Sequence, residues 1–177
     1  MFYKKNYQSP IGKLEILCDG TSVKGIWFEN QKYYGSHFEL NSIQTSENEV
    51  IKQVEKWLDA YFNGEQPSLE QLNLQPDVTD YRKKVLKILV EIPYGKTMTY
   101  KEIAEKLNNK YPSNKTSARA VGGAVGHNPI SILIPCHRVV GTNASLTGFA
   151  GGLNRKVELL ALEGFDKKIL ETGFIKK

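Results

Sequence analysis

A cysteine stands directly before a histidine in the segment IPCHRVVG, residues 134–141. Cys136 could be a packed core thiol, a metal ligand or a nucleophile. A structural zinc site needs about four ligands close together, whereas the chain has two cysteines, Cys18 and Cys136, and three histidines scattered along its length. We therefore expect no metal. The residues around Cys136 must decide between a buried thiol and a nucleophile.

A nucleophilic cysteine depends on its neighbours, because the thiolate and not the thiol attacks. A nearby histidine lowers the pKa of a thiol, and a carboxylate orients the histidine. His137 and Glu163 could supply these two groups. Glu163 falls in the last turn of an expected helix, where the helix dipole disfavours a carboxylate by about 0.3–1 kcal/mol. We therefore expect Glu163 to have a cationic or donor partner elsewhere.

The adjacency of Cys136 and His137 also sets a geometric limit. Neighbouring side chains of an extended segment point to opposite sides. On that geometry His137 would act on Cys136 through a water molecule. Taken alone, the two residues could equally be adjacent by chance, without a shared chemical role.

The charges of the chain are unevenly distributed. Residues 1–76 carry 7 basic and 10 acidic side chains, whereas residues 77–177 carry 17 basic and 9 acidic ones. The half that contains Cys136 is therefore the positive half. A polyanionic partner such as nucleic acid would suit it, although a merely solvated basic surface has the same composition.

A polar stretch with two prolines, residues 65–80, divides the chain. Before it, alternating apolar residues in 12–18 and a turn at 19–22 predict a hairpin with Cys18 facing inward. Residues 47–62 have helical spacing, with an apolar stripe of Val50, Val54, Trp57, Leu58 and Tyr61. We expect the first half to be a small strand-plus-helix domain with a structural role.

The second half is expected to be mainly helical. Val85, Ile88 and Leu89 recur at helical spacing before a break at 93–98. Thr99 and Glu102 then form a capping box that opens a second helix. A polar turn leads to a third helix that starts near Ser117. Two short helices across such a turn suggest a helix-turn-helix, although many unrelated helix pairs look the same.

The third helix is unusual because it is almost bare. Between Ala118 and Gly126 its one long side chain is Arg119, and three positions are glycine. Each interior glycine destabilises a helix by about 1 kcal/mol relative to alanine. The lack of side chains on this helix therefore needs an explanation. Close packing against another helix is one explanation. Contact between Arg119 and phosphates or a stacked base is the other.

A final helix is predicted from the apolar residues Leu153, Val157, Leu160 and Ala161, which would share one face. Gly164 would end it.

Three stretches together resemble one family, the O6-alkylguanine-DNA alkyltransferases. They are IPYGKTMTYKEIA, ARAVGGAVGHNPISILIPCHRVVG and GGLNRKVELLALEG, in order across residues 92–164. The N-terminal SPIGKLEI is similar to the start of the first domain of that family. The resemblance implies an α+β fold, with a ribonuclease H-like strand and helix domain in residues 1–76. A mainly helical, winged-helix-like domain with a helix-turn-helix would occupy residues 77–177.

The resemblance also implies a reaction: double-stranded DNA with an alkylated guanine is bound, the damaged base is flipped out, and Cys136 takes its alkyl group irreversibly. His137, acting through water and oriented by Glu163, would accept the thiol proton. Tyr100 would help to rotate the nucleotide and donate to the guanine. Asn128 would brace the connection to the cysteine segment.

The implied DNA-binding and pocket residues extend this set. Those on the DNA side are Tyr100, Ser117, Ala118, Arg119, Gly122, Gly123 and Ala124, with Arg119 filling the space that the base leaves. The minor groove, about 6 Å wide, would explain the bare helix. Those of the base pocket are Val139, Phe149, Ala150 and Gly151. No cofactor and no metal are implied, and the protein would be a monomer without an obligate protein partner.

Three features depart from the family pattern. Residues 108–117 form a turn about five residues longer than usual, which makes the register there uncertain. Phe149 and Ala150 stand where some relatives have a tyrosine and a serine, which could change the alkyl groups that are accepted. The zinc ligands that some members carry near the N-terminus are missing.

Two other functions remain open from the residues. A lesion-binding protein without catalysis would resemble the same domain, but its cysteine is usually replaced, commonly by tryptophan. A cysteine hydrolase could use Cys136 and His137, but it would need an oxyanion hole and would turn over. No secretion signal or membrane-length apolar run is visible, so we expect a cytoplasmic protein without membrane contact.

Overall fold

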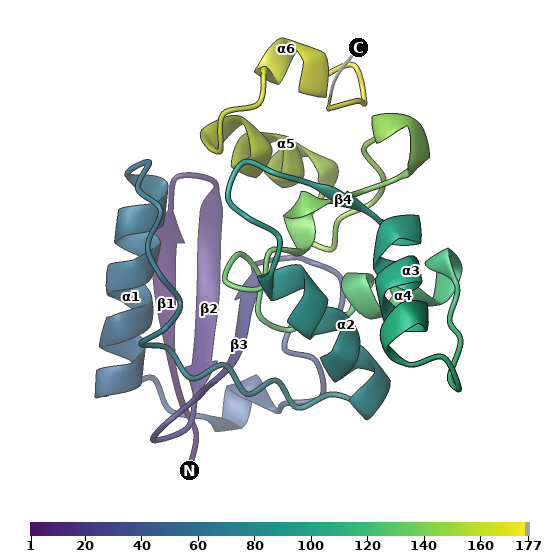
Figure 1. Ribbon diagram of the computed structural model, residues 1–177. Coiled ribbons are helices and arrows are strands. Elements are labelled where there is room, and N and C mark those ends of the chain that lie inside the picture. Colours follow the sequence, from purple (N-terminus) through teal and green to yellow (C-terminus); the bar gives the residue numbers. More distant parts are fainter. Residues whose placement is uncertain (176–177) are drawn as a thin grey trace. The chain divides into compact units, whose positions relative to one another are not determined.

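The computed structural model describes residues 1–175, which form two compact units. The first unit comprises residues 1–77 and 129–133, and the second comprises 78–128 and the residues from 134 onward. Strands and helices are segregated along the chain, so the fold is α+β, as predicted (Figure 1). The expected division into residues 1–76 and 77–177 stays a prediction.

The first unit is a three-stranded antiparallel sheet covered by one helix. The strands β1 (Tyr3–Ser9), β2 (Gly12–Cys18) and β3 (Val23–Phe28) are hydrogen-bonded in chain order. Figure 1 shows α1 (Glu49–Phe62) lying along this sheet. The whole stripe predicted for this helix is buried. Cys18 faces inward and is fully buried, as predicted, with its thiol 3.5 Å from the Asn48 side chain.

The segment just before Ile134 and Cys136 belongs to the first unit. Residues 129–133 lie beside β3, where the Ile26 amide donates to the Pro129 carbonyl (2.8 Å) and the Ser131 amide donates to the Ile26 carbonyl (3.0 Å). The apolar run is buried, as its composition predicted. The chain then enters the second unit at Ile134, two residues before Cys136.

The second unit is built from helices around a two-stranded parallel ladder of β4 (Met98–Thr99) and β5 (Val139–Val140). Its remaining elements, in chain order, are α2 (Asp80–Val90), α3 (Tyr100–Lys110), α4 (Ala118–Gly126), the 3-10 turns η2 (Cys136–Arg138) and η3 (Thr142–Ala144), α5 (Leu153–Leu162) and α6 (Lys167–Leu170). The predicted capping box of Thr99 and Glu102 is present at the start of α3. The first unit also has one 3-10 turn, η1 (Leu40–Ser42).

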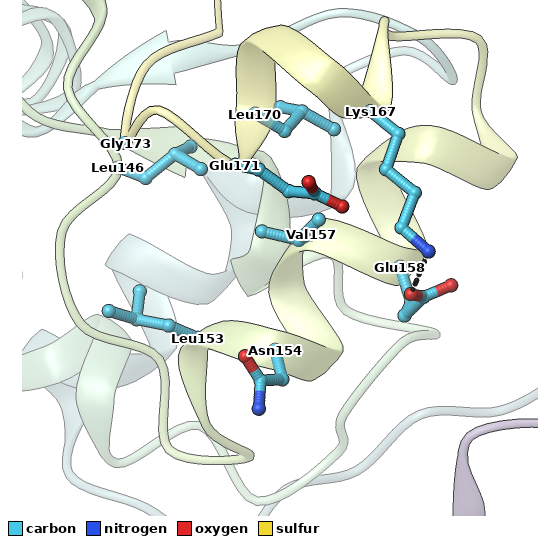
Figure 2. A pocket seen from close by; sticks show the side chains of 9 residues that line it. All are labelled: Leu146, Leu153, Asn154, Val157, Glu158, Lys167, Leu170, Glu171 and Gly173. Carbon is cyan, nitrogen blue, oxygen red and sulfur yellow. Dashed lines mark ion pairs between the residues drawn. The ribbon is translucent and has the colours of Figure 1, made fainter.

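The predicted face of α5 is wrong. Leu160 is buried, but Leu153 is 49% exposed, and Lys156 and Leu159 take the inward positions. Leu153 and Val157 instead border a hollow of about 380 Å³ beside α6 and Leu146 (Figure 2). The helix is rotated because the Lys156 ammonium finds two carbonyl acceptors inside the unit. Apolar spacing alone could not show that a lysine would be an inward residue.

In residues 1–175, no helix combines the length and the apolar composition needed to cross a bilayer.

Candidate active site

Cys136 opens the 3-10 turn η2 and is 5% exposed. Burial raises the pKa of its thiol, because a thiolate loses solvation there. Four groups oppose this effect: the Asn128 side chain, the Lys156 charge and the backbone N–H groups of Cys136 and His137. The extended geometry assumed for 136–137 is wrong, since the segment is helical. Cys136 is thus a buried thiol whose pKa stays above its ordinary value, although these four groups partly offset the effect of burial.

His137 and Glu163 form a buried pair next to Cys136. His137 Nε2 lies 2.6 Å from Glu163 Oε2, and neither side chain has measurable exposure. Burial lowers the pKa of His137 despite the neighbouring carboxylate. The imidazole is therefore neutral near pH 7 and donates from Nε2 to the carboxylate. This arrangement fixes the ring and leaves Nδ1 as the nitrogen on its other side.

Arg138 is the charge partner of Glu163, and sequence reasoning missed it. Its Nε and Nη2 atoms donate to the two carboxylate oxygens at 2.8 and 3.1 Å, and its Nη1 donates to the Ile92 carbonyl at 2.7 Å. Burial pushes the pKa of Glu163 upward, but hydrogen bonds from His137 and Arg138 outweigh it and leave the pKa below its ordinary value. The predicted partner of Glu163 is confirmed, and it lies two residues after Cys136.

A turn of the chain completes the carboxylate site. Glu163 caps the C-terminal end of α5, one residue beyond its last turn. The Gly95 amide donates to Glu163 Oε1 at 3.0 Å. Gly95 has a φ of 75°, and a Cβ atom there would lie 3.2 Å from the Glu163 carbonyl oxygen. A glycine is therefore suited to this close approach.

Lys156 is a second residue that sequence reasoning missed. Its side chain is fully buried, and Nζ donates to the carbonyls of Val139 (2.7 Å) and Thr147 (3.2 Å). Burial lowers its pKa to about 8, and the nearby Cys136 charge opposes that shift. The ammonium therefore places a positive charge near the thiol and ties the loop before α5 to β5. The signal in the sequence that could have revealed this role is a lysine on a helix face that is otherwise apolar.

Asn128 joins the end of α4 to the cysteine segment. Its amide donates to the Val125 carbonyl at 3.2 Å, and its side-chain Nδ2 donates to the Ile134 carbonyl at 2.9 Å. The residue is 4% exposed. These contacts match the bracing position expected for Asn128, and its side chain also favours the Cys136 thiolate.

The helices α3 and α4 pack together and border a shallow hollow of about 330 Å³. Its walls are Tyr100, Lys101, Ala118, Arg119, Gly122, Thr142 and Thr147. The Ser117 side chain caps α4 by accepting from the Ala120 amide (3.2 Å). Burial raises the pKa of Tyr100, and the hydrogen bond from Thr147 opposes that shift. The hollow is large enough for a nucleobase.

The bare helix has one open face and one packed face. Arg119 and Gly123 are exposed, and a Cβ atom added at Gly123 would meet no atom within 4 Å. Ala124, in contrast, is 3% exposed and faces inward. The helical period turns the Ala124 side chain away from the open face, and the expected role of Ala124 in DNA binding stays a prediction.

The remaining pocket residues lie in two segments. Val139 is buried in β5, with its carbonyl engaged by Lys156. Phe149 and Ala150 are half-buried in the loop before α5, and Gly151 is buried. The loop is tied to the cysteine segment through Lys156.

The long turn between α3 and α4 is held at its end. The Asn108 side chain accepts from the Thr116 amide (2.7 Å) and donates to its carbonyl (3.1 Å). The Tyr81 and Thr116 hydroxyls lie 2.6 Å apart, and Lys84 lies 4.2 Å from the centre of the Tyr111 ring. The longer turn therefore leaves the start of α4 anchored to α3 and α2.

Among residues 1–175, no group of three or more histidine, cysteine or acidic side chains is arranged to hold a metal ion.

Two family models match the chain. The model for the DNA binding domain of 6-O-methylguanine DNA methyltransferase matches residues 80–165, and the model for the ribonuclease-like domain of the same family matches residues 2–76. Among curated proteins, the methylated-DNA–protein-cysteine methyltransferase of Haemophilus influenzae is 42% identical over 91% of this chain and 86% of its own length. The protein of that name from Methanosarcina acetivorans is 40% identical over 92% and 98%.

Solved structures of methyltransferases of this kind are also similar to the chain. The Mycobacterium tuberculosis O6-methylguanine methyltransferase is 37% identical, with a TM-score of 0.76 over 92% of this chain and 93% of that one. A structure of the M. tuberculosis protein in complex with DNA is 37% identical, with a TM-score of 0.77 over 91% and 92%.

Proposed function

This protein belongs to the 6-O-methylguanine DNA methyltransferase family, and we propose that it reverses alkylation damage by moving the alkyl group of O6-alkylguanine in double-stranded DNA onto Cys136. The observation that carries this assignment is the buried chain of Cys136, His137, Glu163 and Arg138. The relatives are named for the transfer of a methyl group from DNA to a protein cysteine.

His137 is the proton acceptor in this proposal. It is neutral because of its burial, so it can take the Cys136 proton, through a water molecule as the resemblance implies. The imidazolium that forms faces the ionised Glu163, which Arg138 keeps deprotonated. The thiolate sulfur then bonds to the alkyl carbon as the bond from that carbon to O6 breaks, and the electron pair stays with the guanine.

The DNA side of the proposal uses the open face of α4. Arg119 is the one long side chain there and would fill the space left by the flipped base, at a cost of a few kcal/mol for unstacking. Ser117, Ala118, Gly122 and Gly123 would let the helix approach the groove closely. Tyr100 lies on the wall of the hollow and would donate to the base, which Val139, Phe149, Ala150 and Gly151 would enclose.

Each molecule acts once. The product is a thioether, and the proposal includes no step that restores the Cys136 thiol. We further propose a cytoplasmic monomer that needs neither a cofactor nor a protein partner, with residues 1–76 and 77–177 as its domains.

Mass spectrometry tests the proposal. After the protein is mixed with a duplex that contains O6-methylguanine, the intact mass should rise by one methyl group, and peptide analysis should place it on Cys136. The yield should equal the amount of protein, and Cys136→Ala should gain nothing. Methyl release in excess of protein would indicate a hydrolase instead. A duplex that binds without methylating Cys136 would indicate a lesion-binding protein.

A further inference from the structure

Thr147 makes three separate contacts at the edge of the hollow. Its Oγ1 donates to the Tyr100 hydroxyl oxygen at 3.0 Å, and its backbone carbonyl accepts from Lys156 Nζ at 3.2 Å. Its methyl group lies against Gly141, where an added Cβ atom would come within 2.9 Å of Thr147 Cγ2. The backbone and the methyl group thus hold the loop without using the hydroxyl group.

The hydrogen bond from the Thr147 hydroxyl determines whether the Tyr100 hydroxyl can donate its proton elsewhere. A tyrosine hydroxyl has one proton and can both donate and accept. Because Thr147 donates to the Tyr100 oxygen, that oxygen is the acceptor in this contact, and the Tyr100 proton is available for another partner. Tyr100 and Thr147 both line the hollow of about 330 Å³ that also contains Arg119.

We propose that Thr147 is a positioning residue, which holds the Tyr100 hydroxyl so that its proton faces an alkylated base in the hollow. This inference rests on the proposed function, since it concerns the base that Cys136 would dealkylate. Burial raises the pKa of Tyr100, while the Thr147 contact lowers it. Tyr100 therefore stays protonated near neutral pH, as a donor must.

Two substitutions separate the hydroxyl group from the rest of the side chain. Thr147→Val keeps the shape and the backbone carbonyl but removes the donor, whereas Thr147→Ser keeps the donor. We expect Thr147→Val to slow single-turnover methyl transfer about 5-fold, in line with the loss of one hydrogen bond. Thr147→Ser should stay within about 2-fold of the unchanged protein, because it keeps that hydrogen bond.

A double-mutant cycle distinguishes positioning from a general loss of structure. In a Tyr100→Phe background, Thr147→Val should cause no further slowing, because there is no hydroxyl left to orient. Equal slowing in both backgrounds, or a Thr147→Val rate equal to that of the unchanged protein, would overturn the inference. Thr172→Val serves as the control, since this exposed hydroxyl donates to the Ile169 carbonyl, away from the hollow.

A second measurement does not depend on transfer. The ionisation of Tyr100 can be followed by near-ultraviolet absorbance, as the difference between the titration of the protein and that of its Tyr100→Phe variant. Thr147→Val should raise the pKa of Tyr100, because the contact that lowers it is lost. An unchanged pKa would overturn the inference even if the unchanged protein transferred no methyl group, a result that by itself would overturn the proposed function.

Discussion

At the residue scale, the site depends on one carboxylate that accepts hydrogen bonds from three donors. Glu163 accepts from His137, from Arg138 and from the Gly95 amide, all within a buried region. Arg138 neutralises the carboxylate charge, so His137 can remain neutral while it is held in place. A proton acceptor at the cysteine must be neutral at rest. Under the proposed function, the ion pair would therefore have a chemical role as well as a structural one.

The substitution Glu163→Gln tests both roles. We expect it to lower the free energy of unfolding by about 3 kcal/mol near pH 7, because Arg138 would keep its charge in a buried site without a charged partner. Methyl transfer should slow by about 10²-fold, within the usual contribution of a positioned acid–base group. Urea denaturation and single-turnover kinetics measure the two effects, and Glu158→Gln, at a partly exposed position, is the control.

The pH dependence of this stability has a definite sign. The pKa of Glu163 lies below its ordinary value of 4.5, so its contribution is fully present above that pH and is lost as the pH falls further. The difference in stability between the unchanged protein and Glu163→Gln should therefore stay constant from about pH 7 down to about pH 4.5 and shrink as the pH falls further. A difference that stays constant below about pH 4.5 would contradict the ionised carboxylate.

At the element scale, α4 combines an anchored frame with a bare outer face. Ser117 caps its first turn, and Asn128 ties its end to the segment that leads into the cysteine turn. Its inward face is packed, with Val121, Ala124 and Val125 buried. The outward face carries little beyond Arg119. The glycines thus make the helix less stable, and they do so on its outward face, where the missing side chains would let a partner approach closely.

The substitution Gly123→Ala should move stability and DNA affinity in opposite directions. Alanine at this open, helical position should stabilise the protein by up to about 1 kcal/mol. The added methyl group should weaken binding to a duplex by keeping α4 out of the groove. Thermal unfolding and fluorescence anisotropy measure the two quantities.

Gly20→Ala is the control for this prediction. It lies in the exposed turn between β2 and β3, outside α4, and also has open space around it. It should leave DNA binding unchanged. If Gly123→Ala left DNA affinity unchanged, the open face of α4 would not be the face that meets DNA.

At the scale of the whole molecule, charge is divided between the two parts of the sequence. Residues 77–177 carry a balance of +8, and residues 1–76 carry −3. A partner with a regular array of negative charges would be drawn to the positive part. The exposed Lys110, at the end of α3, and Lys115, on the turn before α4, extend this charge close to Arg119 in the sequence.

DNA binding should therefore depend strongly on salt. If about six phosphates are contacted, affinity should fall about 10³-fold between about 50 and 200 mM salt. Lys115→Ala should reduce the slope of log affinity against log salt by about 1, whereas Lys52→Ala, in the acidic part, should leave it unchanged. Anisotropy titrations at several salt concentrations measure the slope. Binding that is independent of salt would contradict a phosphate-contacting surface.

The sequence by itself determined most of the elements and the motif around Cys136, whose reactive role stays a proposal. The stripe of α1, the capping box at Thr99 and the inward Cys18 follow from local spacing, which acts within a few residues. The motif around Cys136 and the partner expected for Glu163 follow from residue chemistry.

Only the tertiary structure decided which side chains of the site contact one another. It turned the Cys136 segment into a 3-10 turn, placed Arg138 on Glu163 and rotated α5 so that Lys156 is buried. The positions of Arg138 and Lys156 depend on acceptors far away in the sequence, such as the Ile92 and Val139 carbonyls. A buried polar group must find such partners, and a local pattern contains no information about where they lie.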